Sequence, residues 1–139
     1  MFENFIKTGK VRKSEADKAL AKSLIEMSQI HLDFASSIQI TEKNASPLLV
    51  NYYESLREIC EAICSLQGYK VYSHEAFTAY LNEQLKEERL AEKFDRLRKL
   101  RNGINYYGKQ VSKEETQTSA EEIKQIIKEL KEKYLKNLF

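Results

Sequence analysis

The segment Arg101–Gly108, with the sequence RNGINYYG, gathers the residues of this chain best suited to bind an anion. Leu90, Phe94 and Leu97 recur at steps of four and three, the apolar spacing of a helix, and the next step falls on Arg101. We therefore expect Arg101 to point inward or into an interface. A guanidinium keeps its charge in a protein, so in such a position it needs a carboxylate, carbonyl groups, a phosphate or water.

Neutral polar and aromatic residues follow this arginine. Asn102 and Asn105 offer amide donors and acceptors, Tyr106 and Tyr107 offer phenols, and Gly108 is typical of a residue that ends a helix. The pattern favours a binding site over the alternative, which is an arginine that snorkels from the last turn of a helix.

Positive charge is concentrated around the same segment. The whole chain carries a formal net charge of +2. Between positions 93 and 109 one acidic residue, Asp95, faces a larger group of basic ones, namely Lys93, Arg96, Arg98, Lys99, Arg101 and Lys109. This asymmetry points to an anionic partner, although a solvated basic helix face gives the same pattern.

Composition predicts a single helical domain. The 139 residues include only four Gly and one Pro, 32% are charged and 42% are hydrophobic. We assign 1–13 to an N-terminal tail and 14–139 to one domain. A signal peptide and an apolar run of about 20 residues, the length of a membrane span, are both missing, so a cytoplasmic protein is expected.

The cysteines and histidines do not form a recognisable metal or catalytic motif. Cys60 and Cys64 lie one helical turn apart and are interpreted as small core residues, because His31 and His74 are not spaced to complete a metal site. His31 is expected to be a hydrogen-bonded core or interface residue. His74 is expected in the first turn of a helix, whose dipole keeps an imidazole neutral. No metal or cofactor is predicted.

Five helices account for the apolar pattern. Ser14 is expected to cap the first, Ser46-Pro47 to open the second and Gly68 to end it, Ser73 to cap a short third, and Ser119 to open the last after a polar stretch at 109–118. The inward face of the first is predicted to contain Ala16, Leu20, Leu24, Met27, His31, Phe34 and Ile38. That of the second is predicted to contain Leu49, Tyr52, Tyr53, Leu56, Ile59, Cys60, Ile63 and Leu66.

Such amphipathic helices are buried most simply in an all-α antiparallel bundle of four to five helices. The residues before Ser14 include Phe2, Phe5 and Ile6 among basic residues. This tail can fold back on the bundle, pack on a second subunit or meet an anionic surface, and the sequence leaves the three open.

The chain resembles the HEPN family, small all-helical proteins of bacteria and archaea. The likeness lies in the stretches GKVRKSEADKALAKSLIEM, NYYESLREICEAI, GYKVYSHEAFTAYL and RLRKLRNGINYYG, and it covers nearly the whole length. The resemblance implies a helical bundle, usually a homodimer, in which the signature helices of two subunits form a shared cleft. Active members are metal-independent ribonucleases whose arginine holds phosphate and whose histidine assists attack by the ribose 2′-hydroxyl.

Carried onto this chain, the resemblance assigns the signature arginine to Arg101 and its polar neighbour to Asn102. The histidine position falls on Tyr106, or on Tyr107 or Gly108, and no arginine is followed by histidine at the required spacing. The expected catalytic positions are therefore Arg101, Asn102 and Tyr106. The expected nucleic-acid or nucleotide contacts are Arg98, Arg101, Asn102, Asn105, Tyr106, Tyr107 and Lys109.

A phenol with a pKa near 10 is a poor general base, and losing such a base costs about 10²- to 10⁴-fold in rate. The first hypothesis is thus a module that binds RNA or a nucleotide at a dimer cleft with absent or weak catalysis, unless His31 or His74 replaces the missing histidine.

Three alternatives stay open. The chain can be a ribonuclease of the toxin or defence type, or an interaction subunit paired with a separately encoded small nucleotidyltransferase. Arg101 can also be a purely structural residue whose partner is an acid on the second helix, either Glu54, Glu58 or Glu61.

Overall fold

The computed structural model describes residues 1–138, and these residues form a mainly helical bundle. The predicted all-α fold is confirmed, with one small addition of strand. The elements in chain order are α1 (Phe2–Lys7), β1 (Val11–Lys13), α2 (Lys18–Ser36), α3 (Ala45–Leu66), β2 (Tyr69–Val71), α4 (His74–Ala79), the π-helical η1 (Tyr80–Gln84), α5 (Glu88–Tyr107), α6 (Lys113–Tyr134) and the short 3₁₀ turn η2 (Lys136–Leu138).

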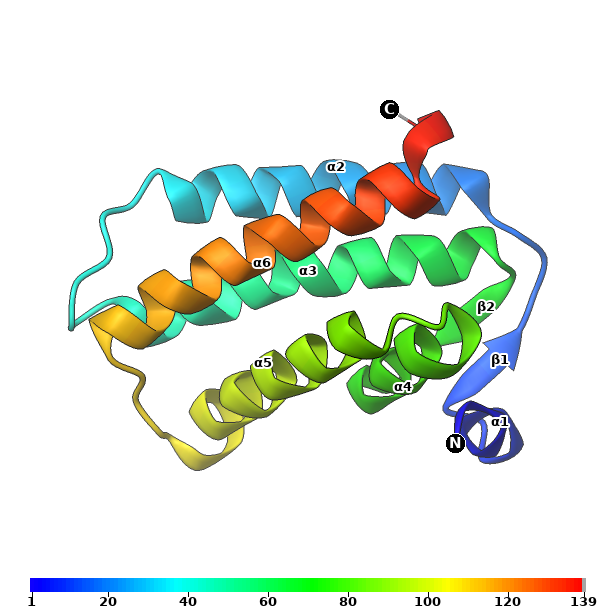
Figure 1. The fold of residues 1–139 in the computed structure, drawn as a ribbon, viewed down its shortest axis with the longest axis horizontal. Helices are drawn as coiled ribbons and strands as arrows, with labels where there is room; N and C mark the ends of the chain where they lie inside the picture. Colours follow the sequence, from blue (N-terminus) through cyan, green and yellow to red (C-terminus); the bar gives the residue numbers. More distant parts are fainter. Residues whose placement is uncertain (139) are drawn as a thin grey trace.

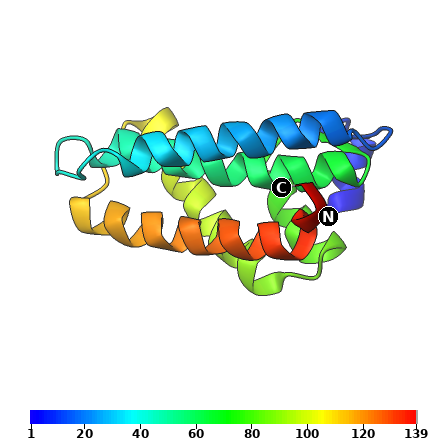
Figure 2. The same cartoon turned by 90° about the horizontal axis from the view of Figure 1, so that it is seen from above.

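Helix α3 lies at the centre of the bundle. It packs along α2 and α6 and also contacts α4 and α5 (Figure 1). Seen from above, α2 and α3 run side by side while α6 lies on a second level (Figure 2). The apolar residues of α3 explain this position, because they cover most sides of the helix and must be shielded from water. Those predicted from Leu49 to Ile63 are all buried. Gly68 follows the end of α3, as predicted.

The buried face of α2 differs from the predicted one. Leu24 is buried, but Leu20, Met27 and Phe34 are exposed, and Phe34 keeps 54% of its surface accessible. The helix begins at Lys18, where the Asp17 carboxylate accepts a hydrogen bond from the amide of Leu20, so Ser14 is not its cap. Three of its buried residues are small, and the buried set is Ala21, Leu24, Ile25, Ser28 and Ala35. The small side chains let the two helices approach closely, whereas four larger apolar residues are left outside: Leu20, Met27, Ile30 and Phe34.

Helix α6 begins seven residues before the predicted start, with Ser112 in place of Ser119 as its cap. The Ser112 hydroxyl accepts a hydrogen bond from the amide of Glu115 and caps the helix, so most of the predicted polar stretch is helical. Thr116 is fully buried and donates to the Ala45 carbonyl. The inward face of this first turn is formed by a buried, hydrogen-bonded polar residue. The sequence therefore shows no apolar residue there that would have predicted a helix.

The N-terminal residues fold back on the bundle, which settles the open alternative for this segment. β1 pairs antiparallel with β2, with Val11 opposite Val71. Phe2 of α1 is buried and packs edge-on against the rings of Tyr69 and Tyr80. These contacts join the start of the chain to the turn between α3 and α4.

The connection between α4 and α5 contains a π-helical turn that the sequence did not reveal. η1 extends α4 through Gln84, with the Leu85 amide bonded to the Tyr80 carbonyl, and Lys86 then adopts a left-handed conformation with φ of 58°. Ser73 occupies the predicted cap position of α4 but makes no side-chain cap bond. None of the helices in the part of the chain described has both the length and the apolarity needed to cross a membrane.

Candidate anion-binding site

Arg101 lies in the last two turns of α5, half-buried among neutral groups. Its guanidinium carbon is 5.7 Å from the centre of the Tyr53 ring of α3 and 5.6 Å from that of Tyr106. Its Nη1 donates to the Asn102 side-chain oxygen at 3.2 Å and to the Tyr106 hydroxyl at 3.4 Å. The rings favour a cation over their faces, but neither they nor the amide carries a compensating charge.

The nearby arginines differ from Arg101 because each of them forms an ion pair with a carboxylate. Arg57 of α3 is paired with Glu54 and with Glu61, the latter at 2.7 Å. Arg98 of α5 is paired with Asp95 at 2.8 Å. Arg101 forms no ion pair with any residue in 1–138. Two of the three acids considered as its structural partners, Glu54 and Glu61, are paired with Arg57 instead.

The third such acid, Glu58, binds His31. The His31 Nδ1 lies 2.7 Å from a Glu58 carboxylate oxygen, so His31 is a hydrogen-bonded histidine at the contact of α2 and α3, as predicted. Burial raises the pKa of Glu58, and His31 opposes that rise. His31 is thus bound to Glu58 of α3 and makes no contact with Arg101 among those described.

The structure brings some predicted site residues together and not others. Arg101, Asn102 and Tyr106 form one contact group. The remaining predicted residues make no hydrogen bond to Arg101 within the described chain. Tyr106 and Tyr107 are 66% and 77% exposed at the end of α5, so both rings are accessible to a ligand.

Arg98, Asn105 and Lys109 complete the predicted set. Arg98 is half-buried and committed to Asp95, whereas Asn105 and Lys109 are exposed. The Lys109 side chain lies back over the end of α5, where a β-carbon on Gly103 would meet its Cδ at 3.4 Å.

Two further residues, Tyr53 and His74, lie beside Arg101; Tyr53 was not predicted for the site, and His74 was named only as a possible replacement for the missing histidine. The Tyr53 hydroxyl and His74 Nδ1 are 2.9 Å apart, and the two rings stack with centres 5.7 Å apart. Tyr53 was expected only as a core residue. The signal that identifies it is chemical, because a tyrosine on a buried stripe still needs a partner for its hydroxyl.

The electrostatics of this pair fix its protonation at neutral pH. Burial raises the pKa of Tyr53 far above its usual value, so the phenol stays protonated. Burial, followed by the charges of Arg101 and Arg57, lowers the pKa of His74 to about 4. The low pKa agrees with the neutral state expected for His74, and its main causes are burial and arginine charge.

The hydrogen bond between these residues also fixes the tautomer. The Tyr53 side chain is buried and its hydroxyl has no other hydrogen-bond partner among the described residues, so only donation to Nδ1 of His74 satisfies its O–H. A neutral imidazole whose Nδ1 accepts carries its hydrogen on Nε2. His74 therefore presents a neutral N–H donor in the free protein.

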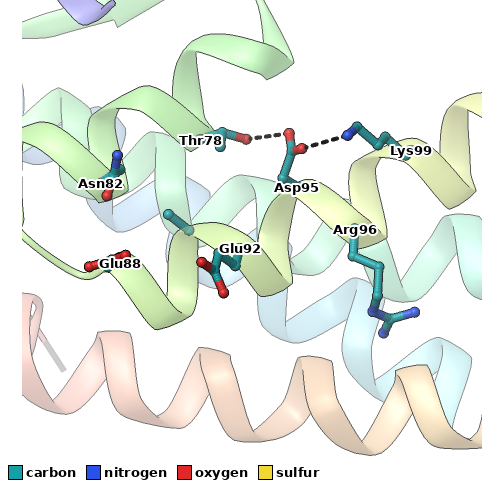
Figure 3. Close-up of a pocket in the computed structure, with 8 residues that line it drawn as sticks. Thr78, Asn82, Glu88, Glu92, Asp95, Arg96 and Lys99 are labelled. Carbon is teal, nitrogen blue, oxygen red and sulfur yellow. Dashed lines mark hydrogen bonds and ion pairs between the residues drawn. The ribbon is translucent and has the colours of Figure 1, made fainter.

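A separate groove of about 430 Å³ lies between the α4–η1 segment and α5 (Figure 3). Asp95 lies on its wall and receives hydrogen bonds from Thr78 and Arg98, and an ion pair from Lys99. Burial works against ionisation of Asp95, but these bonds outweigh it and lower its pKa. Through its ion pair with Arg98, Asp95 thus connects the groove to the arginines around His74, which are Arg57, Arg98 and Arg101.

The two cysteines are core residues, as predicted. Both are buried free thiols on α3, and burial raises the pKa of Cys60 to about 12. Across residues 1–138, no three His, Cys, Asp or Glu side chains gather closely enough to hold a metal ion.

Protein-family models give no match to this chain, and no curated protein matches it. The resemblance to the HEPN family therefore stays a prediction that rests on the sequence stretches quoted above.

Proposed function

We propose that this protein is a HEPN-like module that binds the phosphate groups of RNA or a nucleotide at Arg101, with absent or weak catalysis. The observation that carries the proposal is the uncompensated charge of Arg101, which is half-buried between Tyr53 and Tyr106 without a carboxylate partner in the described chain. A phosphate would supply the missing negative charge, and a guanidinium can bind two phosphate oxygens with two parallel N–H groups.

The exposed tyrosines support a ligand that carries bases as well as phosphates. Tyr106 touches Arg101, and Tyr107 follows it at the exposed end of the same helix. Single-stranded RNA is commonly bound by stacking unpaired bases on aromatic side chains beside arginines that hold the backbone. A single-stranded segment is therefore the preferred ligand.

Weak catalysis follows from the groups beside Arg101. Tyr106 stands at the signature histidine position, and a phenol is largely protonated at neutral pH. Efficient transfer of a proton from a ribose hydroxyl needs a base whose pKa lies closer to the pH of the reaction.

The test is binding of a fluorescent single-stranded RNA in EDTA, followed by fluorescence anisotropy. Arg101→Ala is expected to weaken binding about 10- to 100-fold, the usual cost of losing a charged hydrogen bond. Arg96→Ala is the matched control, because Arg96 lies on the same helix but is paired with Glu115 and Glu122 of α6. Equal losses in both variants would indicate binding through general positive charge and would contradict the proposal.

The same RNA tests the catalytic part. We expect no cleavage, or slow cleavage, by the native protein and faster cleavage by Tyr106→His, which restores a base with a usual pKa near 6.5. Rapid cleavage by the native protein that Arg101→Ala abolishes would establish the ribonuclease alternative.

The exposed apolar face of α2 supports a homodimer. Leu20, Met27, Ile30 and Phe34 are all exposed, and their spacing places them along one side of the helix. Exposed charges of both signs, Lys22, Glu26 and Asp33, lie on the neighbouring side of the helix. Two copies of α2 packed antiparallel about a twofold axis would bury the stripes and place Lys22 of one copy at the end that carries Asp33 of the other.

Light scattering after size-exclusion chromatography measures the association. Phe34→Glu should convert dimer to monomer, whereas Thr118→Glu, which adds the same charge to an exposed position of α6, should not. A native protein that is monomeric at all concentrations would contradict pairing with a second copy and leave a different protein as the occupant of this face.

A further inference from the structure

His74 lies among charged side chains from two other helices. Arg101 has the largest effect of these charges on His74, and its effect opposes protonation. The other charges that act on His74 are Arg57 and Glu54 of α3 and Arg98 of α5, while the neutral Tyr53 holds its Nδ1.

Most of these charges are already balanced inside the protein. Arg57 has Glu54 and Glu61, and Arg98 has Asp95. The unpaired Arg101 is close to His74, because Tyr53 lies 5.7 Å from the Arg101 guanidinium carbon and is hydrogen-bonded to His74 at 2.9 Å. Arg101 is also the group expected to bind a phosphate.

We propose that phosphate binding at Arg101 is coupled to protonation of His74, so that His74 becomes a second cationic group of the occupied site. This inference rests on the proposed function. A bound phosphate cancels the Arg101 charge, which together with burial keeps His74 neutral, and its own negative charge favours an imidazolium nearby.

The proton comes from solvent and adds to Nδ1, the nitrogen that accepts from Tyr53 in the free protein. The hydrogen bond then reverses: Nδ1–H donates to the Tyr53 oxygen, and the phenol turns its own proton away while keeping it. Tyr53 thus serves as a positioning residue that can donate to the neutral ring or accept from the protonated one, although in the second case its own O–H has no acceptor among the described residues.

The coupling predicts tighter binding in acid. In the free protein the pKa of His74 is about 4. If the bound phosphate restores the usual pKa of about 6.5, affinity should be about 20-fold higher at pH 5 than at pH 7, because the bound state then takes up a proton that the free state does not hold.

The first experiment needs no ligand. The pKa of His74 is measured by NMR titration of its ring in the full-length protein, in Arg101→Ala and in the Arg96→Ala control. We expect the His74 pKa to rise in Arg101→Ala and to stay unchanged in Arg96→Ala. An unchanged value in Arg101→Ala would show that this charge does not govern His74 and would overturn the inference.

The second experiment measures binding against pH. The probe is a short 2′-O-methyl oligouridine, because it cannot be cleaved through its 2′-oxygen and neither its phosphodiesters nor its bases titrate between pH 5 and 7. Native protein should show the increase at pH 5, and His74→Gln, which keeps an acceptor for the Tyr53 hydroxyl, should lose that increase.

The outcomes separate the inference from the proposed function. Binding that depends on Arg101 but has the same pH profile in native protein and in His74→Gln would overturn the coupling and leave the phosphate site intact. No binding at either pH, or binding unaffected by Arg101→Ala, would overturn the proposed function, and the coupled site with it.

Discussion

Tyr53 contacts the two residues whose charge states define the candidate site, the guanidinium of Arg101 and the imidazole of His74. Sequence spacing alone was enough to single out Arg101, because a charged residue interrupts an apolar series. It could not associate Tyr53 with Arg101 or choose between His31 and His74 as a replacement for the missing histidine, because only the packing of α3 and α4 against α5 brings Tyr53, His74 and Arg101 together.

His74 makes the stability of the fold depend on pH. Its pKa is about 4 in the folded protein and near its ordinary value of 6.5 when unfolded, so the unfolded chain binds more protons between these values. The stability contribution is complete above about pH 6.5 and is lost as the pH falls toward 4, by at most about 3 kcal/mol.

Urea unfolding at pH 7 and pH 4.5 measures this contribution. The native protein should lose more stability on acidification than His74→Gln, which cannot take up the proton. Equal losses in the two proteins would assign the acid sensitivity to other groups, such as the buried carboxylates.

At the scale of single elements, the sequence predicted α3 well and the faces of α2 and the start of α6 poorly. An unbroken apolar stripe is reliable when a helix is buried on most sides, as α3 is. On α2, Leu20, Met27 and Phe34 face outward although they were predicted to be buried, and small residues fill part of the buried face, so hydrophobicity alone pointed to the wrong side. At the start of α6, buried hydroxyls such as that of Thr116 replace apolar side chains.

The stability of the protein should respond differently to loss of the hydroxyl at Ser112, the cap of α6, and at Ser119 within that helix. Ser112→Ala removes the cap that accepts from the Glu115 amide and should cost about 1 kcal/mol. The buried Ser119 hydroxyl has no hydrogen-bond partner among the described residues, so Ser119→Ala should leave stability unchanged or raise it. Thermal unfolding of the two variants makes the comparison, and a larger loss for Ser119→Ala would contradict it.

For the molecule as a whole, the turn after α3 links the N-terminal segment to the bundle. The Ser14 amide donates to the Gly68 carbonyl at 2.8 Å, and β1 runs beside β2 just beyond this point. Gly68 has φ of 84°, and a β-carbon there would lie 2.7 Å from the Ser14 carbonyl oxygen. The close approach of the two chain segments thus depends on a residue without a side chain.

Gly68→Ala and Gly108→Ala separate backbone strain from this crowding. Both glycines have positive φ, but a β-carbon at Gly108 meets nothing within 4 Å. Gly108→Ala should cost about 1 kcal/mol through strain alone, and Gly68→Ala should cost clearly more. Similar losses in chemical denaturation would show that the segment before α2 moves aside without penalty.

Because α3 is central, the rate at which its two thiols react with a reagent reports how often the bundle opens. Cys60 and Cys64 are buried on the helix that touches α2, α4, α5 and α6, so an alkylating reagent reaches them only when these contacts separate. Labelling followed by mass spectrometry should therefore be slow in the native protein and should accelerate in step with global destabilisation, as in Gly68→Ala. Fast labelling of the native protein would mean that α3 is uncovered by smaller local motions.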